Sequence, residues 1–256
     1  MECVKSIVRA GAWLVVVVPF LHVPGAAAVT VTPMVVDMET VGRRAVARLR
    51  VVNTWANPVP VEVTVERVEL DEEGEPRTAP AEEDFLVFPP LALIPPGRTQ
   101  IFRIQYLGDP DLDRSRSYIF NTRQVPVELP EDTSAIQILF NFRVVVSVAP
   151  PGAEPDLAVV AAEPVTDESD GRIVVRLTVE NRGDGHGYLS RTELRLRYFD
   201  ETSGAEIWQR AFTAEEMRRI VGVGLLQPGK RRRFLLPIEL PRPGGRLEAD
   251  LVHADR

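Results

Sequence analysis

The chain of 256 residues contains one cysteine and three histidines. Cys3 and His22 lie in an N-terminal segment that is predicted below to be removed, so the mature chain keeps only His186 and His253. Without cysteine, the mature chain cannot form a disulfide, use a thiol nucleophile or bind zinc through thiolates. We therefore expect its stability to come from packing rather than from cross-links or structural metals.

The chain also has fewer basic than acidic residues. Its 30 Lys and Arg and 37 Asp and Glu give a net charge of −7. A protein whose main role is to bind the phosphate backbone of nucleic acid usually has a net positive charge, so nucleic acid is not expected as a partner. The hydrophobic content of 45% lies in the ordinary globular range and permits a sizeable core. The length favours one or two domains.

Long apolar runs are absent beyond the N-terminal segment, which has the pattern of a cleavable export signal. Lys5 and Arg9 form a positive start, residues 13–21 are largely apolar, and residues 26–28 are small. Cleavage is expected after Ala28. The apolar run is too short for a membrane span, which needs roughly 20 apolar residues. We therefore predict a signal peptide over residues 1–28 and an exported mature chain that does not insert into the membrane.

The rest of the chain alternates short apolar segments with clusters of Pro, Gly, Asn and Asp, which is typical of β-strands joined by turns. The predicted strands before a proline-rich break are 29–37, 44–53, 59–70, 85–88, 100–106, 118–126 and 135–148. Those after the break are 157–164, 173–181, 189–199, 207–212, 232–239 and 246–253. Such a count is expected of an all-β chain with two consecutive immunoglobulin-like β-sandwich domains, here 29–149 and 156–256.

The break itself, residues 150–155, holds three prolines. Because proline cannot continue a β-ladder, this segment is predicted to be a stiff, extended linker. One short helix is also expected after Thr213, which forms a capping-box pattern with Glu216. Gly222 is expected to end this helix.

No catalytic centre is predicted. A hydrolase needs an activated nucleophile, usually beside a histidine. His186 lies between Gly185 and Gly187, where a turn is the simpler interpretation, and His253 lies in a terminal strand. The chain is therefore expected not to be an enzyme, and neither a cofactor nor a metal site is expected.

Two charged runs each admit a structural and a functional interpretation. Residues 69–75 are mostly acidic, and we predict a solvated hairpin tip there, with a loop for a divalent cation as the alternative. Residues 230–233 are basic, and we predict a turn that leads into an edge strand, with an anionic partner as the alternative.

The strand predicted at 135–148 shows the most informative pattern in the chain. Ile136, Ile138, Phe140 and Phe142 share one of its faces, because side chains alternate along a strand. In one interpretation this is an inner strand whose large side chains enter the core of their own sandwich. In the other, this face is offered to another chain. Alternation alone cannot separate the two interpretations.

The order of several segments resembles the PapD-like periplasmic pilus-assembly chaperones, and the likeness runs along the whole first domain. The segments, before the alternating strand and Pro150, are VVNTW at 51–55, DFLVFPP at 84–90, IPPG at 94–97, QIFRI at 100–104, SRSY at 115–118 and VP at 125–126. The resemblance implies two immunoglobulin-like domains set at an angle. It also implies that a pilus, fimbrial or coat subunit binds along the last strand of the first domain. Such subunits lack a strand, which the chaperone supplies by donor-strand complementation.

The resemblance assigns the donor positions to Ile136, Ile138 and Phe140, which alternation had already grouped together. Phe142 is the next large side chain in the same row. In this mode of binding, main-chain hydrogen bonds provide affinity and the alternate side chains fix the register. The four residues are therefore the predicted apolar part of a subunit-binding site.

Three positions depart from what the resemblance implies. An arginine and a lysine would hold the carboxylate of the subunit, but the corresponding residues here are Val35 and Val145. An arginine before the closing proline would form an interdomain salt bridge, but that residue is Ala149. The nearest basic candidate for the carboxylate is Arg143, followed by Arg123. These departures favour a divergent branch that serves a spore-coat-U-like or archaic-type pilus.

The predicted function is that of a periplasmic chaperone in fimbrium biogenesis and cell wall organization. It would cap pilus, fimbrial or spore-coat-U-like subunits and deliver them to an outer-membrane usher. The alternative is an exported two-sandwich module with a structural or adhesive role in the envelope. The sequence leaves open whether the free protein self-associates through its exposed strand.

Overall fold

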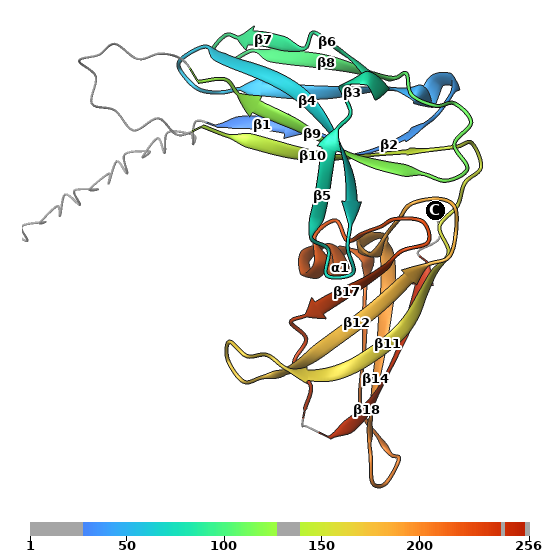
Figure 1. Ribbon diagram of the computed structural model, residues 1–256. Helices are drawn as coiled ribbons and strands as arrows, with labels where there is room; N and C mark the ends of the chain where they lie inside the picture. Colours follow the sequence, from blue (N-terminus) through green and yellow to red (C-terminus); the bar gives the residue numbers. More distant parts are fainter. Residues whose placement is uncertain (1–27, 127–138, 242–243, 254–256) are drawn as a thin grey trace, which may run out of the picture.

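A computed structural model describes residues 28–126, 139–241 and 244–253, which form two β-sandwiches set at an angle (Figure 1). The predicted signal peptide, residues 1–28, lies outside the described residues except for Ala28. Each sandwich has its own hydrophobic core, so the fold is all-β with two immunoglobulin-like units, as predicted. Within the described ranges, no helix is long and apolar enough to cross a membrane.

The first sandwich consists of two sheets. One sheet has the strand order β1-β3-β8-β6, with β1 (Val29–Thr32), β3 (Val46–Asn53), β8 (Thr99–Tyr106) and β6 (Phe85–Phe88). The other has the order β2-β10-β9-β4-β5, with β2 (Val35–Glu39), β10 (Asn141–Ala149), β9 (Arg116–Gln124), β4 (Val59–Leu70) and β5 (Pro76–Pro80), and β7 (Leu91–Ile94) also pairs with β4. Short 3-10 helices precede β3 and β6 at Gly42–Ala45 and Glu82–Asp84.

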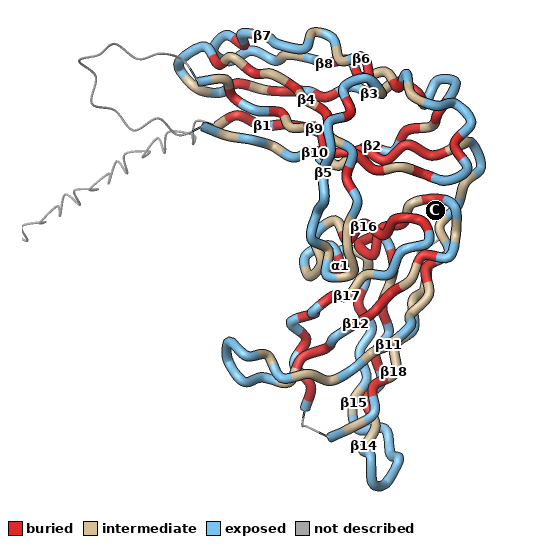
Figure 2. Tube along the Cα trace, viewed as in Figure 1, coloured by how far each residue is buried: buried red, intermediate tan, exposed pale blue. Residues whose placement is uncertain are grey.

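The core of the first sandwich is formed by apolar residues of both sheets. Figure 2 shows buried stretches in strands of both. Leu49 and Phe102 enter it from one sheet, and Phe120 and Val146 enter it from the other, all four fully buried. Burial of such side chains stabilises the fold by roughly 1.5 to 3 kcal/mol each. Buried residues of β3 and β8 alternate with less buried ones, as expected of strands that cover a core with one face.

The first predicted strand, 29–37, is wrong as a single element. It divides into β1, which pairs antiparallel with β3, and β2, which pairs in parallel with β10 in the other sheet. The division falls at Pro33, which has no N–H group to give to a ladder. The sequence pattern also missed β5 and β7. Every residue of β5 is exposed, so this strand shows no alternation between buried and exposed positions.

The second sandwich packs β11 (Leu157–Thr166), β12 (Ile173–Asn181) and β17 (Arg231–Leu236) against β15 (Glu206–Phe212), β14 (Thr192–Asp200) and β18 (Gly245–His253). A small ladder joins β13 (Gly187–Tyr188) and β16 (Leu225–Leu226), and a 3-10 helix spans Leu189–Arg191. The helix α1 (Ala214–Val221) confirms the predicted capping box, since Thr213 Oγ1 accepts the N–H of Glu216 and the Glu216 carboxylate accepts the N–H of Thr213. Gly222 ends the helix as expected, and Met217 is buried in the core.

One buried asparagine in each sandwich holds a turn to the sheet. The amide of Asn53 donates to the carbonyls of Asn57 and Ile94 at 2.9 Å. The amide of Asn181 donates to the carbonyls of Gly185 and Leu226 at 2.8 and 3.1 Å. Asn53 belongs to the VVNTW segment, so the structure gives that segment a structural role.

The segment predicted as a linker, 150–155, is attached at its end to the second sandwich. Glu154 N–H donates to the carboxylate of Asp184, and Gly185 N–H donates to the carbonyl of Glu154. Gly183 and Gly185 lie directly against the backbone of Glu154, so that a Cβ atom on either would meet it at 2.2 and 2.7 Å, respectively. The end of the linker therefore packs as part of the second sandwich.

Candidate functional site

The strand β10 has two halves with different neighbours. Its second half, residues 145–149, pairs with β2 on one side and with β9 on the other. Its first half, residues 141–144, pairs with β9 but with no second strand among the described residues. We call residues 141–144 the open edge. Unpaired backbone groups of this kind can form hydrogen bonds with a strand from another chain.

The open edge exists because the segment 29–39 crosses from one sheet to the other. Its first part, β1, pairs with β3, and only its second part, β2, pairs with β10. β2 begins to cover β10 only where Val145 N–H donates to the carbonyl of Met34, at 3.0 Å. Backbone groups of a strand point alternately to its two neighbours. The groups of Asn141 and Arg143 therefore point to the same side as those of Val145, where the described residues place no strand beside them.

Two aromatic side chains lie beside the open edge. Val144 and Val146 are fully buried in the first core, and Phe140 and Phe142 continue the same face but are only half-buried. The Phe140 ring contacts Trp55 edge-on at 6.1 Å between centroids and lies 5.2 Å from Phe142. Both side chains are thus turned toward their own core and are incompletely covered by it.

The other predicted donor positions, Ile136 and Ile138, lie outside the described residues, as does most of the predicted strand before Leu139. The described strand begins at Asn141, so Phe140 directly precedes it. Of the four apolar residues that alternation placed on one face, the structure therefore describes only Phe140 and Phe142.

The opposite face of β10 points to the second sandwich. Arg143 and Val145 line a cavity of about 330 Å³ between the sandwiches, together with Leu70, Leu225 and Arg232. Arg143 is exposed and forms no ion pair with any described residue. Its guanidinium is therefore available to an anion that enters this cavity.

Arg232 reaches the same cavity from β17. It donates from Nη1 to the carbonyl of Leu225 at 2.8 Å, while its buried Nε has no hydrogen-bond partner in the described parts of the chain. Burial lowers the pKa of Arg232, although the carboxylate of Asp71 opposes this effect. An unsatisfied donor on a desolvated cation favours the approach of an acceptor.

The remaining basic candidate, Arg123, is already engaged, because its Nε donates to the carboxylate of Glu62. Val35 and Val145 lie opposite one another on β2 and β10, so the two positions implied by the resemblance are adjacent in space and both apolar. Of the two basic candidates, only Arg143 lines a cavity between the sandwiches and lacks an ionic partner among the described residues.

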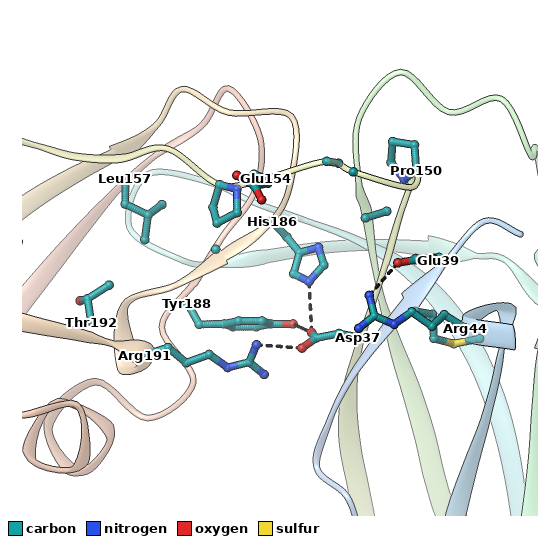
Figure 3. Close-up of a pocket in the computed structure, with 16 residues that line it drawn as sticks. Asp37, Glu39, Arg44, Pro150, Glu154, Leu157, His186, Tyr188, Arg191 and Thr192 are labelled. Carbon is teal, nitrogen blue, oxygen red and sulfur yellow. Dashed lines mark hydrogen bonds and ion pairs between the residues drawn. The ribbon is translucent and has the colours of Figure 1, made fainter. Parts of the chain in front are cut away.

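A cluster of polar side chains joins the sandwiches at the far end of β10 (Figure 3). Asp37 of β2 accepts hydrogen bonds from Tyr188 at 2.7 Å and Arg191 at 2.8 Å, and His186 Nε2 lies 3.1 Å away. Because a carboxylate only accepts, Nε2 carries the proton in this contact. We call these four residues the Asp37 cluster; they line a cavity of about 530 Å³.

The Asp37 cluster favours ionised Asp37. Partial burial opposes ionisation, but the hydrogen bonds from His186, Tyr188 and Arg191 outweigh it and hold the pKa of Asp37 well below its usual range. Burial and the nearby Asp37 carboxylate raise the pKa of Tyr188, which therefore remains a hydrogen-bond donor. His186 is thus a side chain that joins the sandwiches, and the turn predicted around it is present.

A second interdomain contact is formed by the hairpin of β4 and β5, which reaches from the first sandwich to β17 (Figure 1). Arg233 N–H donates to the carbonyl of Glu72 at 2.6 Å, and its guanidinium contacts Glu72 and Glu73 at 2.8 and 2.6 Å. The side-chain amide of Gln227 donates to the carbonyl of Val68 and accepts the N–H of Leu70, both at 2.8 Å. We call this the hairpin contact.

The hairpin contact corrects the interpretation of both charged runs. The acidic run is a hairpin tip, as predicted, but it is not simply solvated, because it lies against the second sandwich. The basic run leads into a strand, as predicted, and its anionic partner is this acidic tip. In the described residues, no group of His, Cys, Asp or Glu is arranged to hold a metal ion.

The sequence did not identify Asp37, Gln227 or Arg232 as interdomain residues. Asp37 stands 149 positions from His186, and Gln227 stands 159 positions from Val68. Local periodicity carries no information on pairs so far apart. The only signal was the presence of an acidic run, 69–75, and a basic run, 230–233, in one chain.

The first of the two sandwiches has an open strand edge, a feature that is typical of proteins that bind an extended segment by strand addition. Residues 28–154 match the family model described as the pili and flagellar-assembly chaperone, PapD N-terminal domain. The chain therefore belongs to the PapD-like pilus-assembly chaperones. No curated protein sequence matches it.

Solved structures support the same fold. A chain from a chaperone–tip adhesin complex of CFA/I fimbriae biogenesis is 13% identical, with a TM-score of 0.51 and coverage of 89% of this chain and 100% of its own. The class 5 fimbriae chaperone CfaA is 12% identical, with a TM-score of 0.51 and coverage of 87% and 98%. The YadV chaperone is 16% identical, with a TM-score of 0.50 and coverage of 88% and 93%. At these identities the likeness establishes the two-sandwich fold.

Proposed function

We propose that this protein is a periplasmic chaperone that binds pilus, fimbrial or spore-coat-U-like subunits by strand addition to β10 and passes them to an outer-membrane usher. The observation that carries the proposal is the open edge. It combines unpaired backbone groups with half-buried aromatic side chains on a strand that is otherwise enclosed. Family membership supports the chaperone role, and the client, the usher and the location are the parts that we add.

The chemistry of the open edge fits a client that lacks one strand. A client strand beside residues 141–144 would accept and donate hydrogen bonds with Asn141 and Arg143. It would also cover the exposed parts of Phe140 and Phe142, which is worth roughly 1 kcal/mol for each half-buried ring. Ile136 and Ile138 extend the same row in the proposal. The gain is offset in part by association costs, so the client can be released again.

We propose that Arg143 binds the carboxylate at the end of the client chain, with Arg232 as a second donor. Both side chains line the same cavity between the sandwiches. Charge-assisted hydrogen bonds from two guanidinium groups would replace those of the arginine and lysine that Val35 and Val145 have displaced. Arg123 is the weaker candidate because of its ion pair with Glu62.

Delivery to an usher requires a surface that remains accessible while β10 is occupied. The outer face of the other sheet carries Leu86, Phe88 and Ile101, which are 50%, 66% and 49% exposed. Exposed apolar residues that gather in this way are typical of protein interaction sites. We propose this face for the usher, since β10 belongs to the opposite sheet.

The test is co-purification of a co-expressed, tagged pilus subunit with Phe140→Asp. We expect at least a tenfold loss of bound subunit, because a carboxylate cannot enter an apolar groove, while thermal unfolding of the isolated variant still shows a folded first sandwich. Leu139→Asp is the matched control, since Leu139 is the adjacent exposed residue. Unchanged binding by Phe140→Asp, or unfolding of its first sandwich, would contradict the proposal.

A further inference from the structure

The strand β2 is an edge strand with a single partner in its sheet. It pairs with the second half of β10 and has no strand on its other side among the described residues. Val36 and Met38 point into the first core, whereas Asp37 between them points to the second sandwich. β2 is therefore held from three directions: by β10, by the core and by the Asp37 cluster.

The contacts of the Asp37 cluster are concentrated on a single pair of residues. Asp37 lies opposite Ser147 in the β2–β10 ladder. The Tyr188 hydroxyl reaches both, at 2.7 Å from Asp37 Oδ1 and 3.2 Å from Ser147 Oγ. Arg191 also lies over the Tyr188 ring, at 4.2 Å from its centroid. The second sandwich thus bridges the two strands where they pair.

We infer that the Asp37 cluster is a positioning device that keeps β2 on β10 and so fixes where the open edge ends. This inference rests on the proposed function. A client strand along the open edge lies in line with β2 and must stop where Met34 begins to cover Val145. The second sandwich therefore sets the register of a client that binds to the first.

The physical reason is that strand register depends on where pairing can begin and end. A slip of one residue would turn every client side chain to the other face of the sheet. If β2 left β10, the open edge would extend to Ala149 and the stop would be lost. The hydrogen bonds to Asp37 oppose this release without occupying any backbone group of the open edge.

Hydrogen exchange of the isolated protein tests the inference without a client. The variant Tyr188→Phe/Arg191→Ala removes two donors of the cluster and changes no residue of β2 or β10. We expect about tenfold faster exchange at Val145 N–H, which donates to Met34, and at Thr40 N–H, which donates to Ala149, because local opening follows the lost contacts. Amides of β3 and β8 are expected to keep their protection.

Two further variants make the result specific. Arg195→Ala removes an exposed arginine on β14 that is not part of the cluster, and we expect no change in exchange. A disulfide between Val35→Cys and Val145→Cys, which replace residues that lie opposite one another, is expected to restore protection when added to the double variant. Unchanged exchange in the double variant, or faster exchange throughout the first sandwich, would overturn the inference.

Binding of a peptide measures how often β2 leaves β10 and exposes more of its edge. A fluorescent peptide with the sequence of residues 34–39 is expected to bind the double variant at least fivefold more tightly than the wild type, because β2 then leaves its place more often. Equal affinity would overturn the inference. None of these measurements uses a pilus subunit, so a failure of the proposed client binding would be recognised separately.

Discussion

The Asp37 cluster and the hairpin contact join the same two sandwiches with different chemistry. In the first, one carboxylate accepts bonds from three side chains of the segment 186–191. In the second, the hairpin forms one backbone hydrogen bond, hydrogen bonds with the buried side-chain amide of Gln227, and exposed ion pairs. The cluster therefore depends on a single carboxylate, whereas the hairpin contact depends mainly on groups that do not titrate.

This difference means that solution conditions can separate the two contacts. Acid acts on the carboxylate of the cluster, and salt screens the exposed ion pairs of the hairpin. Neither condition removes the hydrogen bonds of Gln227, which is buried. The angle between the sandwiches is thus supported by one contact that responds to pH and one that is largely insensitive to it.

The largest effect is expected from Gln227→Ala, which breaks the hairpin contact at its buried amide. The carbonyl of Val68 and the N–H of Leu70 would lose their partner, at a cost of about 1 to 3 kcal/mol in the free energy of unfolding. Urea denaturation measures this loss. Gln209→Ala, at an exposed position on β15, is the control and is expected to stay within about 0.5 kcal/mol of the wild type. Equal losses in both variants would contradict the role of the amide.

Gly74→Ala is expected to have the next largest effect, because it changes the hairpin tip. Gly74 has φ of +89°, and a Cβ atom there would lie 2.1 Å from Nη2 of Arg232. We expect a loss of about 1 to 2 kcal/mol from the left-handed backbone alone, with a further loss from displacement of Arg232. Gly97→Ala, at φ of +67° in open space, measures the backbone part. If both variants lose the same stability by urea denaturation, the Arg232 contact contributes nothing.

Asp37→Asn is expected to show that the stability contributed by the Asp37 cluster depends on pH. The folded state lowers the pKa of Asp37 from 3.8, so its contribution is fully present above pH 3.8 and falls as acid lowers the pH further. Because the side chain is 40% exposed, solvent screening reduces this contribution to about 1 kcal/mol at neutral pH. Unfolding by urea between pH 7 and about pH 2 measures it, and the difference between variant and wild type is expected to shrink toward acid. A constant difference would show that charge is not the cause.

The smallest effect is expected from Glu72→Gln/Glu73→Gln, which removes the exposed ion pairs with Arg233. The loss is expected to stay below about 1 kcal/mol per pair. It is expected to disappear near 1 M salt, where screening acts over roughly 3 Å. Thermal unfolding at low and high salt measures the loss. An effect that persists at high salt would mean that the backbone bond from Arg233 to Glu72 had been lost as well.

Local patterns predicted most of the strands because alternation reports burial on one face. β12 has the predicted bounds of 173–181, and α1 follows its capping box. The failures also have local causes. The segment 29–37 was predicted as one strand, yet it divides at Pro33 into two parts that join different sheets.

The candidate site was less predictable, because it is defined by the absence of a described strand beside residues 141–144 of β10. Alternation grouped Phe140 and Phe142, but it could not show that β2 covers only residues 145–149 of β10. Interdomain residues such as Asp37 and Gln227 depend on pairs far apart in the chain. The family resemblance pointed to the strand that carries the open edge, and the structure shows that Val35 and Val145 lie side by side.

The attachment of Glu154 to the second sandwich has a consequence for evolution. Gly183 and Gly185 leave no room for a side chain against the backbone of Glu154, so both sites are expected to remain glycine. Any bending between the sandwiches would then be confined to the short stretch before Glu154. Homologues that keep these two glycines are expected to share the same interdomain geometry even where their surfaces have diverged.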